Sequence, residues 1–164
     1  YFVLLPDIAY EEGKPGVSAV DCVTAAINEV LAHESLDKKR IGLIGHSFGG
    51  YETSFIVTQT NLFAAAISGA GFNDFISSYL SVGLNNKKQD TWRYEFNQLR
   101  MGVPLFDNFD RYLQNSPVTF APKVNTPFLL CTGTDDSAID YSQSLEFHLV
   151  LRRLGKPNIL LHYE

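Results

Sequence analysis

The feature that most constrains the fold is a short apolar run that leads into a serine flanked by glycines. Residues 41–51 read Ile-Gly-Leu-Ile-Gly-His-Ser-Phe-Gly-Gly-Tyr. Residues 40–44 predict a buried strand, and residues 51–60 have the apolar spacing of a helix. Ser47 is therefore expected on a sharp turn between a strand and a helix.

This arrangement is the nucleophile-elbow pattern of the α/β-hydrolases. A serine on such a turn is exposed, and the N–H of the next residue points at the same position. The pattern therefore predicts Ser47 as the nucleophile and the backbone N–H of Phe48 as one oxyanion-hole donor. Gly45 and Gly49 are expected to leave room for the turn, because a Cβ at either position would press on the neighbouring strand or helix. The alternative is a glycine-rich turn that carries an ordinary surface serine.

Alternating apolar runs and helical stripes predict an α/β fold over the whole chain. Helical patterns cover residues 16–33, 51–60 and 140–154, with Ser18 as the expected N-cap of the first and Asp140 of the last. Short links between the elements favour a mostly parallel sheet with helices on both faces. About five strands are expected, near residues 1–6, 40–45, 63–68, 127–132 and 158–163.

Residues 72–111 break this alternation, since they are aromatic, polar and irregular. We interpret them as an excursion with short helices over the carboxyl edge of the sheet. A further helix is expected over residues 107–115, ended by Ser116-Pro117.

Length and charge exclude several classes of partner. The 164 residues allow one domain at most, and 45% hydrophobic residues suffice for a core. A net charge of −5 without a basic run disfavours nucleic acid and anionic membranes, and no apolar stretch reaches the length of a spanning helix. Cys22 and Cys131 are expected to be two buried thiols rather than a disulfide or metal pair. The sequence indicates no metal and no cofactor.

Four segments together resemble the catalytic domain of the prolyl oligopeptidase family, especially its dipeptidyl-peptidase and acylaminoacyl-peptidase branches. They are residues 41–51, Ser116-Pro117, residues 127–139 and residues 160–164. The resemblance implies a serine peptidase that acts on peptides through a Ser-Asp-His triad and an acyl-enzyme. It also implies a β-propeller upstream, so we expect residues 1–164 to be a single partial α/β-hydrolase domain, truncated at both ends.

The resemblance implies that the acid is Asp136. In the family the acid stands three residues after a glycine, here Gly133, and Ile139 takes the place of a valine. Asp135 remains an alternative, and Asp74 is another because some hydrolases carry the acid one strand earlier. The acid would accept the imidazole Nδ1–H and stabilise the imidazolium.

His162 and His148 remain alternatives for the base, but neither lies where the resemblance places it. The order in these hydrolases is Ser, Asp, His, and only His148 and His162 follow Asp136. His148 is expected within a helix and His162 within the last strand, whereas the family's histidine follows that strand. His46 is expected to point away from Ser47, and His33 ends a helix. We therefore expect the catalytic histidine beyond Glu164, and this chain alone to be nearly inert.

The remaining parts of the site are less defined. In the family a tyrosine upstream supplies the second oxyanion donor, but Tyr10 lies in the wrong loop for this role. Tyr79, Trp92 and Tyr94 are candidates for the substrate pocket, although each can equally be an ordinary core aromatic. A carboxylesterase or lipase of the same fold and a non-catalytic hydrolase-like module remain alternatives. The sequence leaves open a homo-oligomer and a cytoplasmic or periplasmic location.

Overall fold

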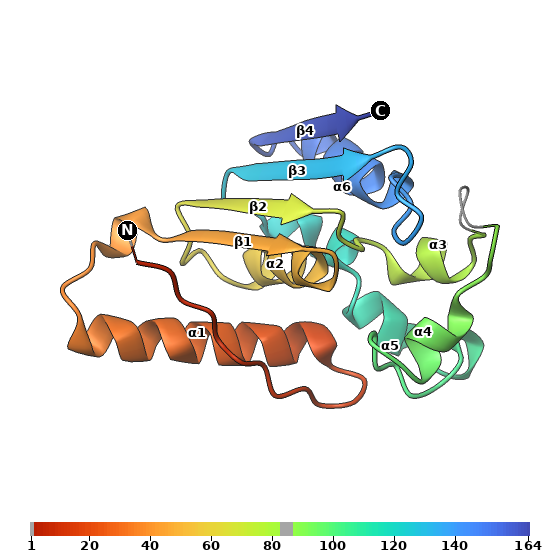
Figure 1. Ribbon diagram of the computed structural model, residues 1–164, viewed down its shortest axis with the longest axis horizontal. Coiled ribbons are helices and arrows are strands. Elements are labelled where there is room, and N and C mark those ends of the chain that lie inside the picture. Colours follow the sequence, from red (N-terminus) through yellow and green to blue (C-terminus); the bar gives the residue numbers. More distant parts are fainter. Residues whose placement is uncertain (1, 83–86) are drawn as a thin grey trace.

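The computed structural model describes residues 2–82 and 87–164 (Figure 1). Its centre is a parallel sheet of four strands whose spatial order follows the chain. The strands are β1 (Gly42–His46), β2 (Ala65–Gly69), β3 (Phe128–Gly133) and β4 (Asn158–Tyr163). The α/β fold with a parallel sheet is thereby confirmed, with four strands in place of about five.

Three helices of twelve residues or more accompany the sheet in the described residues, and the short α-helices lie beyond its carboxyl edge (Figure 1). The long helices are α1 (Pro15–His33), α2 (Phe48–Gln59) and α6 (Ser142–Arg153). The short α-helices are α3 (Phe75–Tyr79), α4 (Thr91–Glu95) and α5 (Phe109–Gln114). The 3₁₀-helices are η1 (Lys38–Arg40), η2 (Leu105–Asp107) and η3 (Pro117–Lys123).

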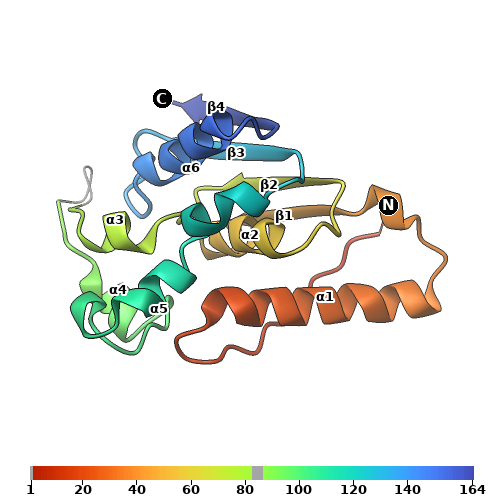
Figure 2. The ribbon, with the colours of Figure 1, turned by 180° about the vertical axis from the view of Figure 1, so that it is seen from behind.

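One face of the sheet is packed and buried. Phe128 and Leu130 of β3 point into a cluster with Val57 of α2 and with Phe147 and Leu151 of α6. Figure 2 shows α2 and α6 on this face. Alternate residues of β3 are buried and half-buried, as expected where a strand packs on helices on one side.

The expectation of helices on both faces is met on one face only, within the described residues. Ile44 and Ile159 are 75% and 62% exposed on the other face, which Figure 1 shows without a helix. The physical reason is the strand order. Right-handed crossovers between strands that follow one another in space all pass over the same face of a sheet. An alternation of strands and helices does not reveal this order.

The predicted strand at residues 1–6 was wrong. Within the described chain, residues 2–10 join no strand or helix, and Phe2 and Leu5 are 77% and 87% exposed. An apolar run becomes a strand only where a neighbouring strand takes its backbone hydrogen bonds.

The predicted helix starts differ in detail from those observed. Helix α1 begins at Pro15 after Lys14, and Ser18 lies inside its first turn, where its Oγ donates to the Lys14 carbonyl. The expected cap at Ser18 was therefore wrong, because a proline at the first helical position fixes the start earlier. Helix α6 begins at Ser142 with Tyr141 as its N-cap, so the expected N-cap at Asp140 was wrong by one residue. Asp140 Oδ1 still accepts the Ser142 N–H at 2.9 Å.

Candidate active site

Ser47 occupies the turn between β1 and α2 in a strained backbone conformation. Its φ is 57° and its ψ is −120°. A non-glycine residue with positive φ costs on the order of 1–3 kcal/mol and persists only where its surroundings fix it. The Ser47 N–H donates to the Gly69 carbonyl at 2.8 Å, and its carbonyl accepts from Tyr51 at 3.1 Å. These two bonds hold the strained turn in place.

The glycines around Ser47 differ in how much space their surroundings leave for a Cβ atom. A Cβ on Gly45 would overlap the carbonyl of Gly49, and one on Gly50 would meet the carbonyl of Gly69. A Cβ on Gly49 would find only Glu52 Oε2, at 4.0 Å. The space argument is thus confirmed for Gly45 and wrong for Gly49. The sequence analysis missed the requirement at Gly50, although the doubled glycine was its signal.

Phe48 is the first residue of α2, so its N–H is one of those that the helix leaves without an internal partner. Among the described residues, no Ser47 side-chain hydrogen bond caps α2. The Phe48 ring is buried between Tyr10 and Tyr51, with centroid distances of 5.8 and 5.3 Å. The arrangement leaves a hydroxyl and a backbone donor side by side at the end of β1.

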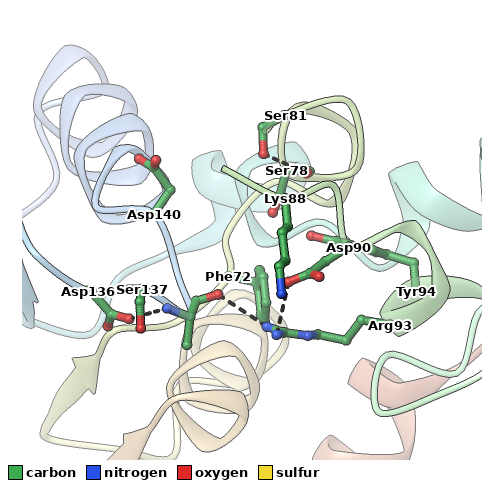
Figure 3. A pocket seen from close by; sticks show the side chains of 11 residues that line it. Phe72, Ser78, Ser81, Lys88, Asp90, Arg93, Tyr94, Asp136, Ser137 and Asp140 are labelled. Atoms are coloured by element: carbon green, nitrogen blue, oxygen red, sulfur yellow. Dashed lines mark hydrogen bonds and ion pairs between the residues drawn. The ribbon is translucent and has the colours of Figure 1, made fainter. Parts of the chain in front are cut away.

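The loop after β3 presents Asp136 at the same edge of the sheet. Asp136 Oδ1 accepts the N–H group of Ala138 at 2.8 Å (Figure 3). It also accepts the N–H group of Ile139, at 3.0 Å. Ile139 is buried in the core, so the loop that carries the carboxylate is anchored. Asp135 is exposed.

Arg93 of α4 ties the excursion to this loop. Its Nη1 donates to the Ala138 carbonyl at 3.1 Å, and its Nη2 pairs with Asp90 at 3.0 Å (Figure 3). Arg93, Asp90 and Asp136 line one pocket together with Phe72, Tyr94 and residues near the start of α6. The excursion and the Asp136 loop therefore line a pocket together.

The strand register relates Ser47 to Asp136. His46 and Cys131 both pair with Gly69 of β2, so β1 and β3 lie two strands apart. Strands lie about 4.8 Å apart, which separates His46 from Cys131 by about 10 Å. β3 runs two residues further, to Gly133, before the Asp136 loop begins.

Asp74, the alternative acid, caps the start of a helix. It follows β2 and its Oδ1 accepts the N–H groups of Ile76 and Ser77, at 2.8 and 3.3 Å, as the N-cap of α3.

The four histidines lie in different places. His33 pairs with Glu29 on α1, and His46 lies over Gly69 on the sheet. His148 is half-buried in α6. His162 of β4 stacks on Tyr141, with ring centroids 5.2 Å apart, and β4 is three strands from β1.

The three aromatic pocket candidates divide into two groups. Tyr79 and Tyr94 belong to the buried core, where Tyr94 packs edge-on against Phe72 and Phe75. Tyr94 also lines the pocket beside Asp136. Trp92, by contrast, is 53% exposed on α4.

A polar cluster beside Phe48 was missed by the sequence analysis. Tyr10 Oη donates to Glu52 Oε1, and the Arg100 guanidinium lies 3.9 Å from the centre of the Tyr10 ring. Burial raises the pKa of Glu52 and of Tyr10. The three residues come from separate segments, so no local motif could have indicated the cluster.

Metal ligands are not gathered in the described residues. In residues 2–82 and 87–164, no three His, Cys, Asp or Glu side chains form a group that could hold a metal ion. Cys22 and Cys131 are free, half-buried thiols.

Comparisons with known proteins identify the family and several relatives of this chain. The prolyl oligopeptidase family matches residues 10–164. The chain is 28% identical to an uncharacterized peptidase, YuxL, of Bacillus subtilis over 92% of this chain and 22% of that protein. It is also 28% identical to the acylamino-acid-releasing enzyme of Sus scrofa, over 92% of this chain and 20% of that enzyme.

A solved structure shows the same architecture. The acylaminoacyl peptidase of Pyrococcus horikoshii superposes with a TM-score of 0.82 at 30% identity, over 93% of this chain and 24% of that one. The chain thus spans about a fifth to a quarter of the length of these proteins. Among the described helices, none is long and apolar enough to cross a membrane.

Proposed function

Because this chain belongs to the prolyl oligopeptidase family of serine peptidases, we propose that it carries the nucleophile and the acid of a peptidase site, Ser47 and Asp136. The strained conformation of Ser47 at the carboxyl end of β1 is the observation that carries the proposal. An ordinary surface serine gains nothing from a positive φ, whereas a nucleophile on an elbow requires it.

The chemistry follows from the positions of these groups. A histidine takes the Ser47 proton as Oγ attacks the substrate carbonyl. The Phe48 N–H donates to the oxyanion that forms, and a second donor comes from outside the groups assigned here. The histidine then returns the proton to the leaving amine, and water hydrolyses the acyl-enzyme by the same steps. Asp136 accepts the Nδ1–H of this histidine and stabilises its charged form.

We further propose that the base is a histidine that follows β4 in the longer protein. The His162 ring is already stacked on Tyr141 and lies three strands from the nucleophile. His33 pairs with Glu29, and His46 lies over Gly69. The end of β4 lies beside the start of the Asp136 loop, because the Thr134 N–H donates to the Tyr163 carbonyl at 2.9 Å.

We propose that the substrate is a peptide. The names of the relatives suggest that the N-terminus of this peptide is acylated. The curated relative from Sus scrofa is called an acylamino-acid-releasing enzyme, and the Pyrococcus structure an acylaminoacyl peptidase. We propose cleavage after an N-acylated residue, with the pocket beside Phe72 and Tyr94 receiving part of the substrate. A β-propeller upstream would limit access to short peptides.

Substitution of the two carboxylates in the full-length protein tests the assignment. Asp136→Asn is expected to lower kcat by about 10³–10⁴-fold, since a neutral amide favours the wrong tautomer of the base. Asp135→Asn is the matched control in the same loop and should stay near the wild type. Ser47→Ala should abolish both turnover and labelling by a fluorophosphonate probe.

Assays with an anilide substrate and an ester substrate distinguish the proposed peptidase from an esterase. We expect N-acetyl-alanyl-p-nitroanilide to be hydrolysed by the wild type. Hydrolysis of p-nitrophenyl butyrate with no cleavage of any acylated or free aminoacyl anilide would contradict a peptidase. Equal losses in Asp135→Asn and Asp136→Asn would contradict the assignment of the acid.

A further inference from the structure

Three side chains that the proposed mechanism does not use lie against the residue that supplies the oxyanion donor. Tyr10 comes from the N-terminal loop, Glu52 from α2, and Arg100 from the segment after α4. Tyr10 Oη donates to Glu52 Oε1. The Arg100 guanidinium carbon lies 3.9 Å from the Tyr10 ring centre and 5.6 Å from that of Phe48.

Two tyrosine rings contact the Phe48 ring. They are Tyr10 of the cluster, at a centroid distance of 5.8 Å, and Tyr51 of α2, at 5.3 Å. The Tyr51 ring is itself held by Phe75, at a centroid distance of 4.7 Å. The Phe48 side chain therefore has little freedom to rotate, and its own backbone N–H is restricted with it.

Backbone hydrogen bonds fix the segments that deliver Tyr10 and Arg100. The Gly13 N–H donates to the Arg100 carbonyl at 2.6 Å. Arg111 Nη1 donates to the Met101 carbonyl, also at 2.6 Å, which connects the segment to α5. The segments that carry Tyr10 and Arg100 are thus held to each other and to α5.

Burial of the polar groups of the cluster costs free energy, because their surroundings are apolar. Glu52 is half-buried, and an apolar side chain would fill its position without the cost of burying a carboxyl. Its hydrogen bond with Tyr10 offsets part of that cost, and Arg100 supplies an opposite charge nearby. A directional bond fixes the position of the Tyr10 ring more sharply than packing alone.

We propose that Tyr10, Glu52 and Arg100 act as positioning residues that aim the Phe48 N–H at the developing oxyanion. The inference rests on the proposed function, since it takes Phe48 as the donor. Tyr10 does not itself donate to the substrate, because its hydroxyl is engaged with Glu52. The cluster acts on the transition state and leaves substrate binding largely unchanged.

Steady-state kinetics of the full-length protein on an N-acetyl-alanyl anilide test this role. Tyr10→Phe and Glu52→Ala should each lower kcat by about tenfold with little change in KM, because a small displacement of a catalytic group costs up to about 10²-fold. Glu52→Gln retains an acceptor oxygen for the tyrosine and should restore most of kcat. The double variant Tyr10→Phe/Glu52→Ala should lose no more than either single variant.

A matched control separates positioning from general loss of stability. Tyr112→Phe also removes one tyrosine hydrogen bond, from Oη to the Val103 carbonyl at 2.8 Å, without contact with Phe48. It is expected to lower the melting temperature while kcat stays unchanged. A Tyr112→Phe variant that lost as much kcat as Tyr10→Phe would overturn the positioning role.

Two further outcomes would overturn the inference. Unchanged kcat in Tyr10→Phe would show that the cluster has no catalytic effect. A loss of about 10²–10³-fold in Tyr10→Phe with a normal Glu52→Ala would indicate that the tyrosine donates directly to the oxyanion. The rate of Ser47 labelling by a fluorophosphonate gives a second readout. It requires no peptide turnover, so it tests the cluster even if the anilide is not cleaved.

Discussion

At the residue scale, the turn at Ser47 has room for an added methyl group at one of its glycines and not at another. Gly45→Ala places a Cβ against the Gly49 backbone, whereas Gly49→Ala meets only a carboxylate oxygen at 4.0 Å. We expect Gly45→Ala to destabilise the protein by about 1–3 kcal/mol, because a backbone cannot yield as a side chain can. Gly49→Ala should be neutral or stabilising by up to about 1 kcal/mol, since it lies in α2. Thermal unfolding of the full-length variants measures both, and equal shifts would contradict the geometry.

The same scale shows what the sequence could predict about the site. Ser47 and Phe48 were found because the elbow is a local motif, in which strand, turn and helix are consecutive. Glu52 was missed because its partners, Tyr10 and Arg100, are 42 and 48 positions away along the chain. A contact between distant segments leaves no periodic or spacing signal, so only the folded structure reveals it.

At the scale of elements, Asp74 connects the end of β2 to the start of α3. Its Oδ1 accepts two backbone N–H groups there, as an N-cap does. Asp74→Ala is therefore expected to cost about 1 kcal/mol, and Asp74→Asn less, because asparagine also caps helices. Both variants should keep kcat. If Asp74→Asn instead lost activity as strongly as Asp136→Asn, the acid would lie one strand earlier than proposed.

Element boundaries were predictable where a local rule operates. Helix α6 ends before Gly155, whose φ of 67° suits glycine, and the expected end there is confirmed. Helix η3 was not predicted, and it contains Pro122 in its interior. Gln143 of α6 accepts the N–H groups of Asn73 and Asp74, at 3.0 and 2.9 Å, and this tie between β2 and α6 has no sequence signature.

At the scale of the whole molecule, strand order decides which face of the sheet is covered. The alternation of strands and helices with short links correctly indicated a parallel sheet. The order β1-β2-β3-β4 then sends every crossover over one face. Composition and periodicity carry no information on spatial order, which explains why helices on both faces were expected and one helical layer was found.

Two half-buried glutamates set a pH dependence for the stability of the molecule. Burial raises the pKa of Glu52, despite the Tyr10 hydrogen bond and Arg100, and it raises the pKa of Glu146, despite a hydrogen bond from Ser77. Each carboxyl therefore holds its proton more tightly in the folded protein than in the unfolded chain, where the ordinary pKa is about 4.3. The contribution of both groups to stability is complete below that pKa and is lost as the pH rises through the folded pKa.

The double variant Glu52→Gln/Glu146→Gln should remove this dependence, because glutamine does not titrate. Between the ordinary and the raised pKa, its free energy of unfolding should fall less steeply with rising pH than that of the wild type. Denaturant midpoints of the full-length protein, measured from about pH 4 to 7, compare the two slopes. A wild-type slope that was more positive than that of the variant would contradict the direction of both pKa shifts. Burial would then not be the dominant influence on these carboxyls.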